Sequence, residues 1–108
     1  MQAPPTVVPN QFVILSREES TADGLAPLGA RDRIVRELFD HNTGPERDGD
    51  DVLYGPGIQI ELPPGQDLVR QMLVTITEEE IGLLVLERLA QTFKWKVVDP
   101  ETGQPLNP

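Results

Sequence analysis

Carboxylates are the side chains of this sequence with the clearest potential for chemistry. Asp48, Asp50 and Asp51 surround a glycine in the polar stretch 42–51, and hard cations such as Ca²⁺ prefer several carboxylate ligands. The spacing does not fit an EF-hand loop, because the glycine directly follows the first aspartate and the closing glutamate is missing. We interpret the stretch as an acidic loop, and keep a weak divalent-cation site at Asp48, Asp50 and Asp51 as the alternative.

Acid–base catalysis would require two carboxylates that converge on a buried pocket. The candidates are Glu61, Asp67, Glu78, Glu79 and Glu80. The three consecutive glutamates are already explained as the first turn of a helix, where the helix dipole favours negative charge.

Other catalytic signatures are missing from the sequence. The chain has no cysteine, no glycine-rich phosphate loop and no serine in a nucleophile elbow. Its one histidine, His41, falls at a predicted helix end, where a positive charge suits the dipole. We therefore expect no catalytic site and no cofactor, and carry a small carboxylate-using enzyme only as a third hypothesis.

Contacts with other proteins have better candidates. Leu84 projects among the polar positions of a predicted helix, although a single exposed leucine is ordinary on a protein surface. Tyr54 stands between the acidic loop and Gly-Pro-Gly. Phe12 and Ile14 belong to the apolar run 12–15, which is either a core or edge strand or an arm that docks on another subunit or partner.

The stretch from 69 to 99 must position these groups, because it holds most of the apolar residues and follows a strand–helix–strand pattern. Thr77 and Glu80 have the spacing of a capping box. Gly82 lies near the middle of the apolar arc, and a glycine there predicts close approach of the helix backbone to a sheet. The arc consists of Ile81, Leu83, Val85, Leu86, Leu89, Ala90 and Phe93.

The remaining patterns predict an α+β fold. We expect a helix over 30–41, an antiparallel hairpin of 58–62 against 69–77, a helix over 78–93 and a strand over 94–99. Together they predict a small mixed, mainly antiparallel sheet of three or four strands, with both helices packed on one face. The last strand is expected beside 69–77 or beyond 58–62.

The same patterns divide the chain into three parts. Residues 1–29 are expected to be a Pro-rich N-terminal arm that contains the short strand 12–15 and a loop. Residues 30–103 form the α+β domain, and residues 104–108 form a loose tail. No motif is specific enough to assign the chain to a family.

Charge and hydropathy narrow the classes of function. A net charge of −9 over 108 residues disfavours binding to nucleic acid or anionic lipid, which requires basic patches. No apolar run is long enough for a membrane span and the first residues lack the features of a signal peptide, so a soluble cytoplasmic protein is expected. We predict a small acidic, non-enzymatic interaction module that binds a protein partner or itself through an edge strand or the apolar arm. The alternative is a domain that responds to a divalent cation or small ligand through the Asp48–Asp51 loop.

Overall fold

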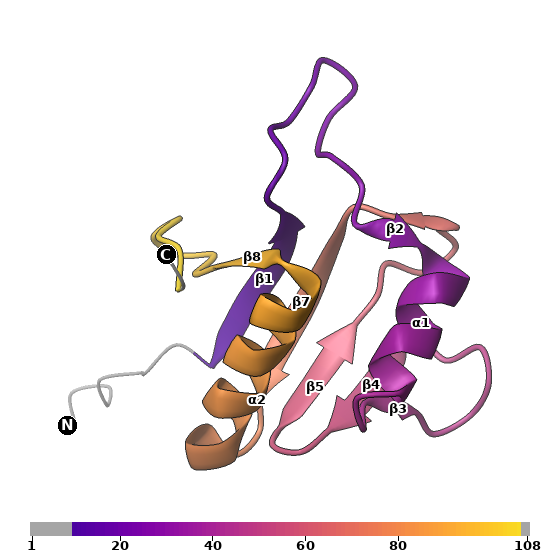
Figure 1. Cartoon of the computed structure of the whole chain (residues 1–108), viewed down its shortest axis with the longest axis vertical. Coiled ribbons are helices and arrows are strands. Elements are labelled where there is room, and N and C mark those ends of the chain that lie inside the picture. The colour runs from indigo at the N-terminus through magenta and orange to yellow at the C-terminus, as the bar shows by residue number, and fades with distance from the viewer. Residues whose placement is uncertain (1–9, 107–108) are drawn as a thin grey trace, which may run out of the picture.

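The computed structural model describes residues 10–106, so residues 1–9 of the predicted Pro-rich arm and residues 107–108 of the predicted tail lie outside the described part of the chain. The two helices and eight strands follow one another in the order shown in Figure 1. They are β1 (Gln11–Ser16), β2 (Gly29–Ala30), α1 (Arg31–Phe39), β3 (Gly44–Pro45), β4 (Val52–Gly55), β5 (Ile58–Glu61), β6 (Leu68–Val69), β7 (Gln71–Ile76), α2 (Glu79–Phe93) and β8 (Trp95–Val98).

The main sheet has six strands in the order β3-β4-β5-β7-β1-β8, and β2 pairs with β6 in a separate two-stranded sheet. The predicted α+β class is confirmed, but the prediction of three or four strands was wrong. Every pair of neighbouring strands in the described chain is antiparallel, so the sheet is not mixed. The predicted hairpin is confirmed by the antiparallel pairing of β5 with β7.

The first strand of the chain, β1, occupies the interior of the sheet. It pairs with β7 on one side and with β8 on the other, so β7 and β8 run in the same direction with β1 between them. Neither of the predicted places for the last strand is correct, because β1 was assigned to an arm outside the domain. The elements β1-α1-β5-β7-α2-β8 form a split β-α-β arrangement, to which β3 and β4 are added at one edge.

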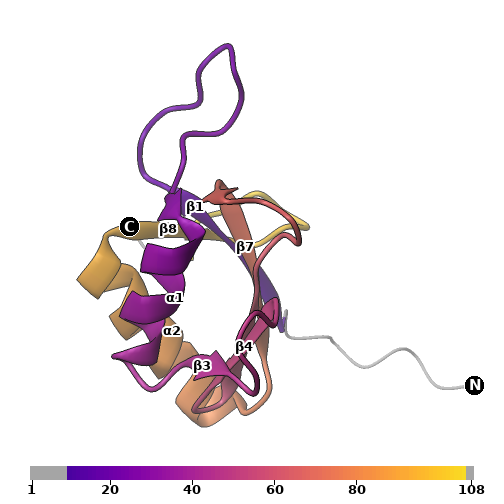
Figure 2. The same ribbon diagram turned by 90° about the vertical axis from the view of Figure 1, so that its right-hand side faces the viewer.

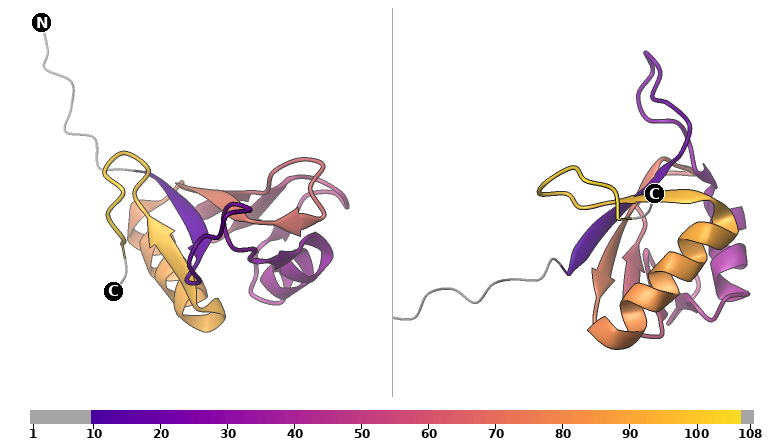
Figure 3. Two further views of the ribbon diagram at one scale, coloured as in Figure 1. Left: turned by 90° about the horizontal axis from the view of Figure 1, so that it is seen from above. Right: turned by 60° about the vertical axis from the view of Figure 1, so that its left-hand side comes forward.

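Both helices lie on the same face of the sheet, as Figures 2 and 3 show. Successive residues of a strand point to opposite faces, so every second strand residue enters the core between the sheet and the helices. The hairpin side chains that point toward the helices are all buried. The buried residues of the main sheet are Phe12, Ile14, Leu53, Ile58, Ile60, Met72, Val74, Ile76, Trp95 and Val97, together with Leu62 just after β5.

Helix α2 approaches the sheet most closely at Gly82. A methyl group on Gly82 would overlap the carbonyl oxygen of Gly57, and one on Gly57 would lie 2.7 Å from the Gly82 nitrogen. Gly57 also has a φ of 70°, which favours glycine. The predicted close approach of the helix backbone is therefore present, and its contact is the turn between β4 and β5.

The start of α2 differs from the predicted capping box. Its N-cap is Glu78, not Thr77, and no side chain caps the helix. Instead, the backbone amides of Thr77 and Glu78 both donate to the Gly57 carbonyl, at 2.8 and 3.2 Å. The tight turn between β4 and β5 thus accepts hydrogen bonds from the two backbone amides that immediately precede α2.

Both edges of the main sheet are short or covered. At one edge, the chain after β8 turns back, and the amide of Leu106 donates to the carbonyl of Val97 at 2.7 Å. At the other edge, β3 has only two residues, one of which is Pro45. Short strands and prolines protect edges from pairing with other chains. The expected recruitment of a partner through an edge strand therefore has no support in this fold.

Candidate functional site

The apolar segment predicted as a docking arm lies in the core. Phe12 is 5% exposed and Ile14 is fully buried, because both point from β1 toward the helices. This corrects their assignment as interaction candidates, and the alternative of a core strand is the one that the structure has. The sequence pattern of a docking arm and that of a central strand are the same, since both are short and apolar.

Helix α2 carries an exposed apolar pair. Leu84 is 64% exposed and Ile81 is 47% exposed, and the two are one turn apart. At 100° per residue, Leu84 lies opposite the buried side of the helix. The buried side consists of Gly82, Leu86, Leu89 and Ala90. Ile81 was predicted inside the buried arc and is not, because it lies at the margin of that arc, about 100° from Gly82.

Charged residues border this apolar pair. Glu80 and Glu87 are exposed on one flank of the Leu84 position, and Arg88 is exposed on the other side. Glu78 and Glu79 add two further exposed carboxylates at the start of the helix. The outer face of α2 is thus an apolar patch with an acidic border and a single basic residue. We call Ile81, Leu84, Glu80 and Glu87 the α2 patch.

The face of the sheet away from the helices forms a second surface. Within residues 10–106 no helix covers it (Figure 3). The strand register places its side chains in three rows that cross the sheet. The rows are Tyr54-Gln59-Thr75-Gln11, Val52-Glu61-Leu73-Val13-Val98, and Gln71-Leu15-Lys96. We call these residues the open face.

Tyr54 is the predicted contact residue that belongs to the open face. It is 45% exposed and stands at the β4 end of the first row. Leu73 and Val13 are neighbours in the middle row and are both half-buried by the residues around them. Loop residues after β5 border a hollow of about 250 Å³ on this face, which Leu73 also lines. The alternation of side chains along the strands predicts such a face only when β1 is placed at the centre of the sheet.

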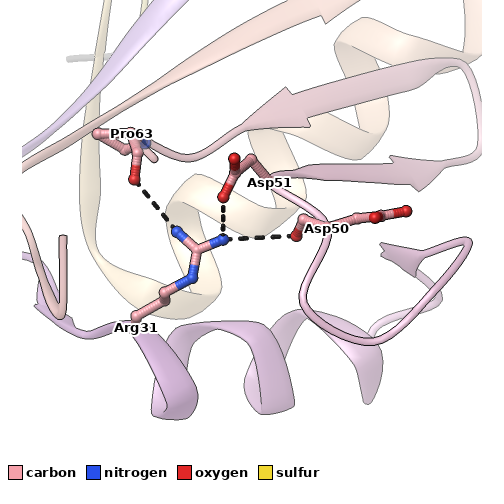
Figure 4. A network of polar contacts seen from close by, with 4 residues as sticks. All are labelled: Arg31, Asp50, Asp51 and Pro63. Atoms are coloured by element: carbon pink, nitrogen blue, oxygen red, sulfur yellow. Dashed lines mark hydrogen bonds and ion pairs between the residues drawn. The ribbon is translucent and has the colours of Figure 1, made fainter. Parts of the chain in front are cut away.

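An arginine contacts the loop that was predicted as an alternative cation site. Arg31, the first residue of α1, donates from Nη2 to the Asp51 carboxylate at 2.5 Å and to the Asp50 carbonyl at 3.4 Å. Its Nη1 donates to the carbonyl of Pro63 at 3.2 Å (Figure 4). Asp48 takes no part in this network. One guanidinium therefore joins α1 to two loops that are distant in the sequence.

This network corrects the metal hypothesis. A cation site at Asp48, Asp50 and Asp51 requires their carboxylates to face one point, whereas Asp51 faces Arg31 and Asp50 contributes its backbone. Among residues 10–106, no group of three or more histidine, aspartate or glutamate side chains is arranged to hold a metal ion. The guanidinium of Arg31 already lies against the Asp51 carboxylate that a cation would have to bind.

Phe39 is an exposed aromatic residue on α1. It is 67% exposed at the end of α1, and it borders a hollow of about 420 Å³ between α1 and the acidic loop. Its ring lies against Gly44, where a Cβ would approach it to 2.9 Å. Phe39 is the last residue of α1, and Leu38 beside it is fully buried.

The groups considered for catalysis do not assemble into a site. All five carboxylates proposed for acid–base work are exposed: Glu61, Asp67, Glu78, Glu79 and Glu80. The Nδ1 atom of His41 lies 2.8 Å from the carbonyl of Glu37, and its ring contacts Phe93 edge-on at 4.9 Å between centroids. Phe93 in turn stacks on Trp95, which is buried. His41 therefore lies just after the end of α1 and packs against the aromatic pair Phe93 and Trp95 through its contact with Phe93.

Comparisons with known proteins give no relative from which a role could be transferred. No protein-family model, curated protein or solved structure gives a significant match to the chain. Neither helix in the described part of the chain has the length and apolar character that crossing a membrane would require. The α2 patch and the open face remain the candidate binding surfaces, because both carry apolar side chains outside the core.

Proposed function

We propose that the protein is a cytoplasmic, non-enzymatic interaction module that binds a basic, apolar segment of a protein partner on the α2 patch. The observation that carries the proposal is the position of Leu84, which is 64% exposed on the side of α2 opposite the core. A leucine there is mostly exposed to solvent and lies outside the core of this chain. Ile81 lies one turn away and extends the same apolar surface.

The chemistry of the partner follows from charge. Glu80 and Glu87 border the apolar pair, and the chain as a whole carries a net charge of −9. A lysine- or arginine-rich segment would gain from this field in its rate of association as well as in its bound state. A basic amphipathic helix or extended segment with spaced apolar residues meets both requirements, since its apolar anchors can cover Ile81 and Leu84.

A designed peptide tests this directly. The probe is a short amphipathic peptide of alternating leucine and lysine positions, and its counterpart carries glutamate in place of lysine. Amide chemical shifts of the ¹⁵N-labelled protein are followed during titration with each peptide. We expect the lysine peptide to shift the resonances of Ile81, Leu84 and Glu87, with weaker binding at higher salt, and the glutamate peptide to leave them unchanged.

Two variants separate the patch from a general attraction between an acidic protein and a basic peptide. Leu84→Asp should abolish the shifts while the rest of the spectrum stays that of the folded protein. Phe39→Asp removes an equally exposed apolar side chain from α1 and should leave binding intact. If Leu84→Asp binds the lysine peptide as well as the unmodified chain does, the attraction is non-specific and the α2 patch is not the binding surface.

The two other functions considered from the sequence have no observation in their favour. The Asp48–Asp51 loop is bound to Arg31, and the five carboxylates considered for catalysis are all exposed. We therefore propose neither a cation-responsive domain nor an enzyme.

A further inference from the structure

We infer that the open face binds the open face of a second copy of this chain, so that the protein forms a two-fold symmetric dimer. This inference is independent of the α2 patch, because the two surfaces lie on opposite sides of the molecule (Figure 2). It rests on three properties of the open face: its apolar middle row, its charge, and the arrangement of that charge about one axis.

The middle row places apolar side chains side by side across three strands. Val13 of β1 is the direct neighbour of Leu73 on β7 and of Val98 on β8. All three are half-buried, and none points toward the core. Leu15 lies in the next row on β1 and extends the apolar surface. A solvated face of an antiparallel sheet is normally polar, so this row indicates a surface that is covered in use.

The charge of the open face differs from that of the rest of the chain. Its three rows contain one acidic residue, Glu61, and one basic residue, Lys96. The charges cancel on this face, although the whole chain carries −9. Two copies that met through other surfaces would bring net negative charge together, whereas two open faces can meet without that repulsion.

The positions of the two charges fit a symmetric pair. Glu61 lies on β5 and Lys96 on β8, and the sheet order between them is β5-β7-β1-β8. A two-fold axis in the plane of contact, running between β7 and β1, places β5 of one copy over β8 of the other. It therefore sets Glu61 of each copy opposite Val98 of its mate, with the longer Lys96 side chain in the adjacent row, about 7 Å further along the strand. The same axis sets Leu73 opposite Val13.

The hollow on the open face fits the same arrangement. It opens between β7 and the loop after β5, and it is lined by Leu73, Gln71 and Pro63. The axis between β7 and β1 places Leu15 of the second copy near this hollow, since Leu15 shares a row with Gln71. A side chain of one copy thus meets a depression of the other, as an isologous contact requires.

The size of the open face sets the expected strength. Five strands about 4.8 Å apart and three rows about 7 Å apart cover roughly 500 Å² in projection. Stable interfaces bury about 800 Å² on each partner, and weaker ones bury less. We therefore expect a dimer that dissociates on dilution, with a dissociation constant on the order of micromolar.

Charge reversal tests the arrangement with variants that keep the core intact, because both charged side chains are exposed. Sedimentation velocity over a wide range of protein concentration gives the dimer dissociation constant. Glu61→Lys sets lysine against lysine, and Lys96→Glu sets glutamate against glutamate. Each should weaken dimerisation by about tenfold or more. The double variant, which restores opposite charges, should recover the dimer of the unmodified chain.

A mixing experiment supplies the sharpest readout. When the Glu61→Lys and Lys96→Glu chains are combined, both charge pairs of a mixed dimer become attractive, so mixed dimers should form more tightly than either variant forms alone. A full-length chain that is monomeric at all concentrations would overturn the inference. So would a dimer insensitive to both charge reversals, or one lost only in Leu84→Asp, which would mean that the copies meet through α2.

Discussion

Replacing Gly82 with alanine should destabilise the protein, although the same change favours most helices. Alanine in a helix interior is about 1 kcal/mol more favourable than glycine. Here the added methyl group would overlap the carbonyl oxygen of Gly57, and it would lie 2.9 Å from Cγ2 of Ile76. Neither neighbour can yield easily, because Gly57 is part of a tight turn and the Ile76 side chain is buried in the core.

The expected loss of stability in Gly82→Ala depends on the interactions that must shift to make room for the methyl group. The Gly57 carbonyl accepts hydrogen bonds from the amides of Thr77 and Glu78, and each such bond contributes about 0.5–1.5 kcal/mol. Forcing an extra methyl group into a packed contact costs about 1–3 kcal/mol in other proteins. After the gain in helix propensity is subtracted, we expect Gly82→Ala to lower the free energy of unfolding by about 2–3 kcal/mol.

Urea denaturation followed by circular dichroism measures this difference, and an exposed position in the same helix provides the control. At Glu87, which is exposed, the alanine variant should be about 1 kcal/mol more stable than the glycine variant. The order at position 82 should be the reverse. If Gly82→Ala is as stable as the unmodified chain, or more so, the backbone contact between α2 and the β4–β5 turn is not as close as described.

Four further changes test other parts of the structure. Arg31→Ala should lower the free energy of unfolding by about 1–2 kcal/mol, because three acceptors lose their donor and Asp51 is partly solvated. Arg31→Lys, which cannot reach both loops, should recover only part of this stability. An unchanged midpoint in urea for Arg31→Ala would refute a stabilising role of the Arg31 network. Ile14→Ala should cost about 2–5 kcal/mol from the fully buried centre of the sheet, whereas Leu84→Ala should change stability by less than about 0.5 kcal/mol; equal effects in thermal melts would contradict the placement of β1. Titration with Ca²⁺ or Mg²⁺ should leave the amide resonances of Asp48 to Asp51 unchanged, and saturable shifts there would revive the cation site. Deletion of residues 104–108 removes the backbone hydrogen bond from Leu106 to Val97 and should increase aggregation, as judged by light scattering, because the β8 edge is then uncovered.

Local periodicity predicted the parts of the fold whose partners are close in sequence. The hairpin of β5 and β7, its buried face and the long helix α2 all follow from spacing within one stretch of chain. The sheet as a whole depends on β1, whose pairing with β7 and β8 spans most of the sequence. No local pattern distinguishes a short apolar strand at the centre of a sheet from one in an arm, so the strand order was missed. The strand count was missed because β3 and β4, at the β5 edge of the sheet, were not predicted.

The candidate surface residues also separate into those that local spacing identifies and those that depend on contacts distant in the sequence. Leu84 stood out because its helical position conflicts with its apolar side chain, and it is indeed exposed. Ile81, at the margin of the apolar arc, is exposed as well, and helical spacing alone does not show which residues at the margin of a wide arc are buried. Asp51 looked like a ligand because its partner, Arg31, is distant in the sequence. The open face required the strand register before its rows could be recognised.

The place of β1 in the sheet governs how the chain acquires its structure during synthesis. Residues 11–16 leave the ribosome well before the strands that flank them, because β7 and β8 come from residues 71–98. Until then Phe12 and Ile14 have no strand partners, and their apolar side chains are open to chaperones or to other nascent chains. Pairing between such distant segments is slow, because a long loop must close before any contact compensates for the lost entropy. The domain therefore folds as one unit after its last strand has been made, rather than progressively from its N-terminus.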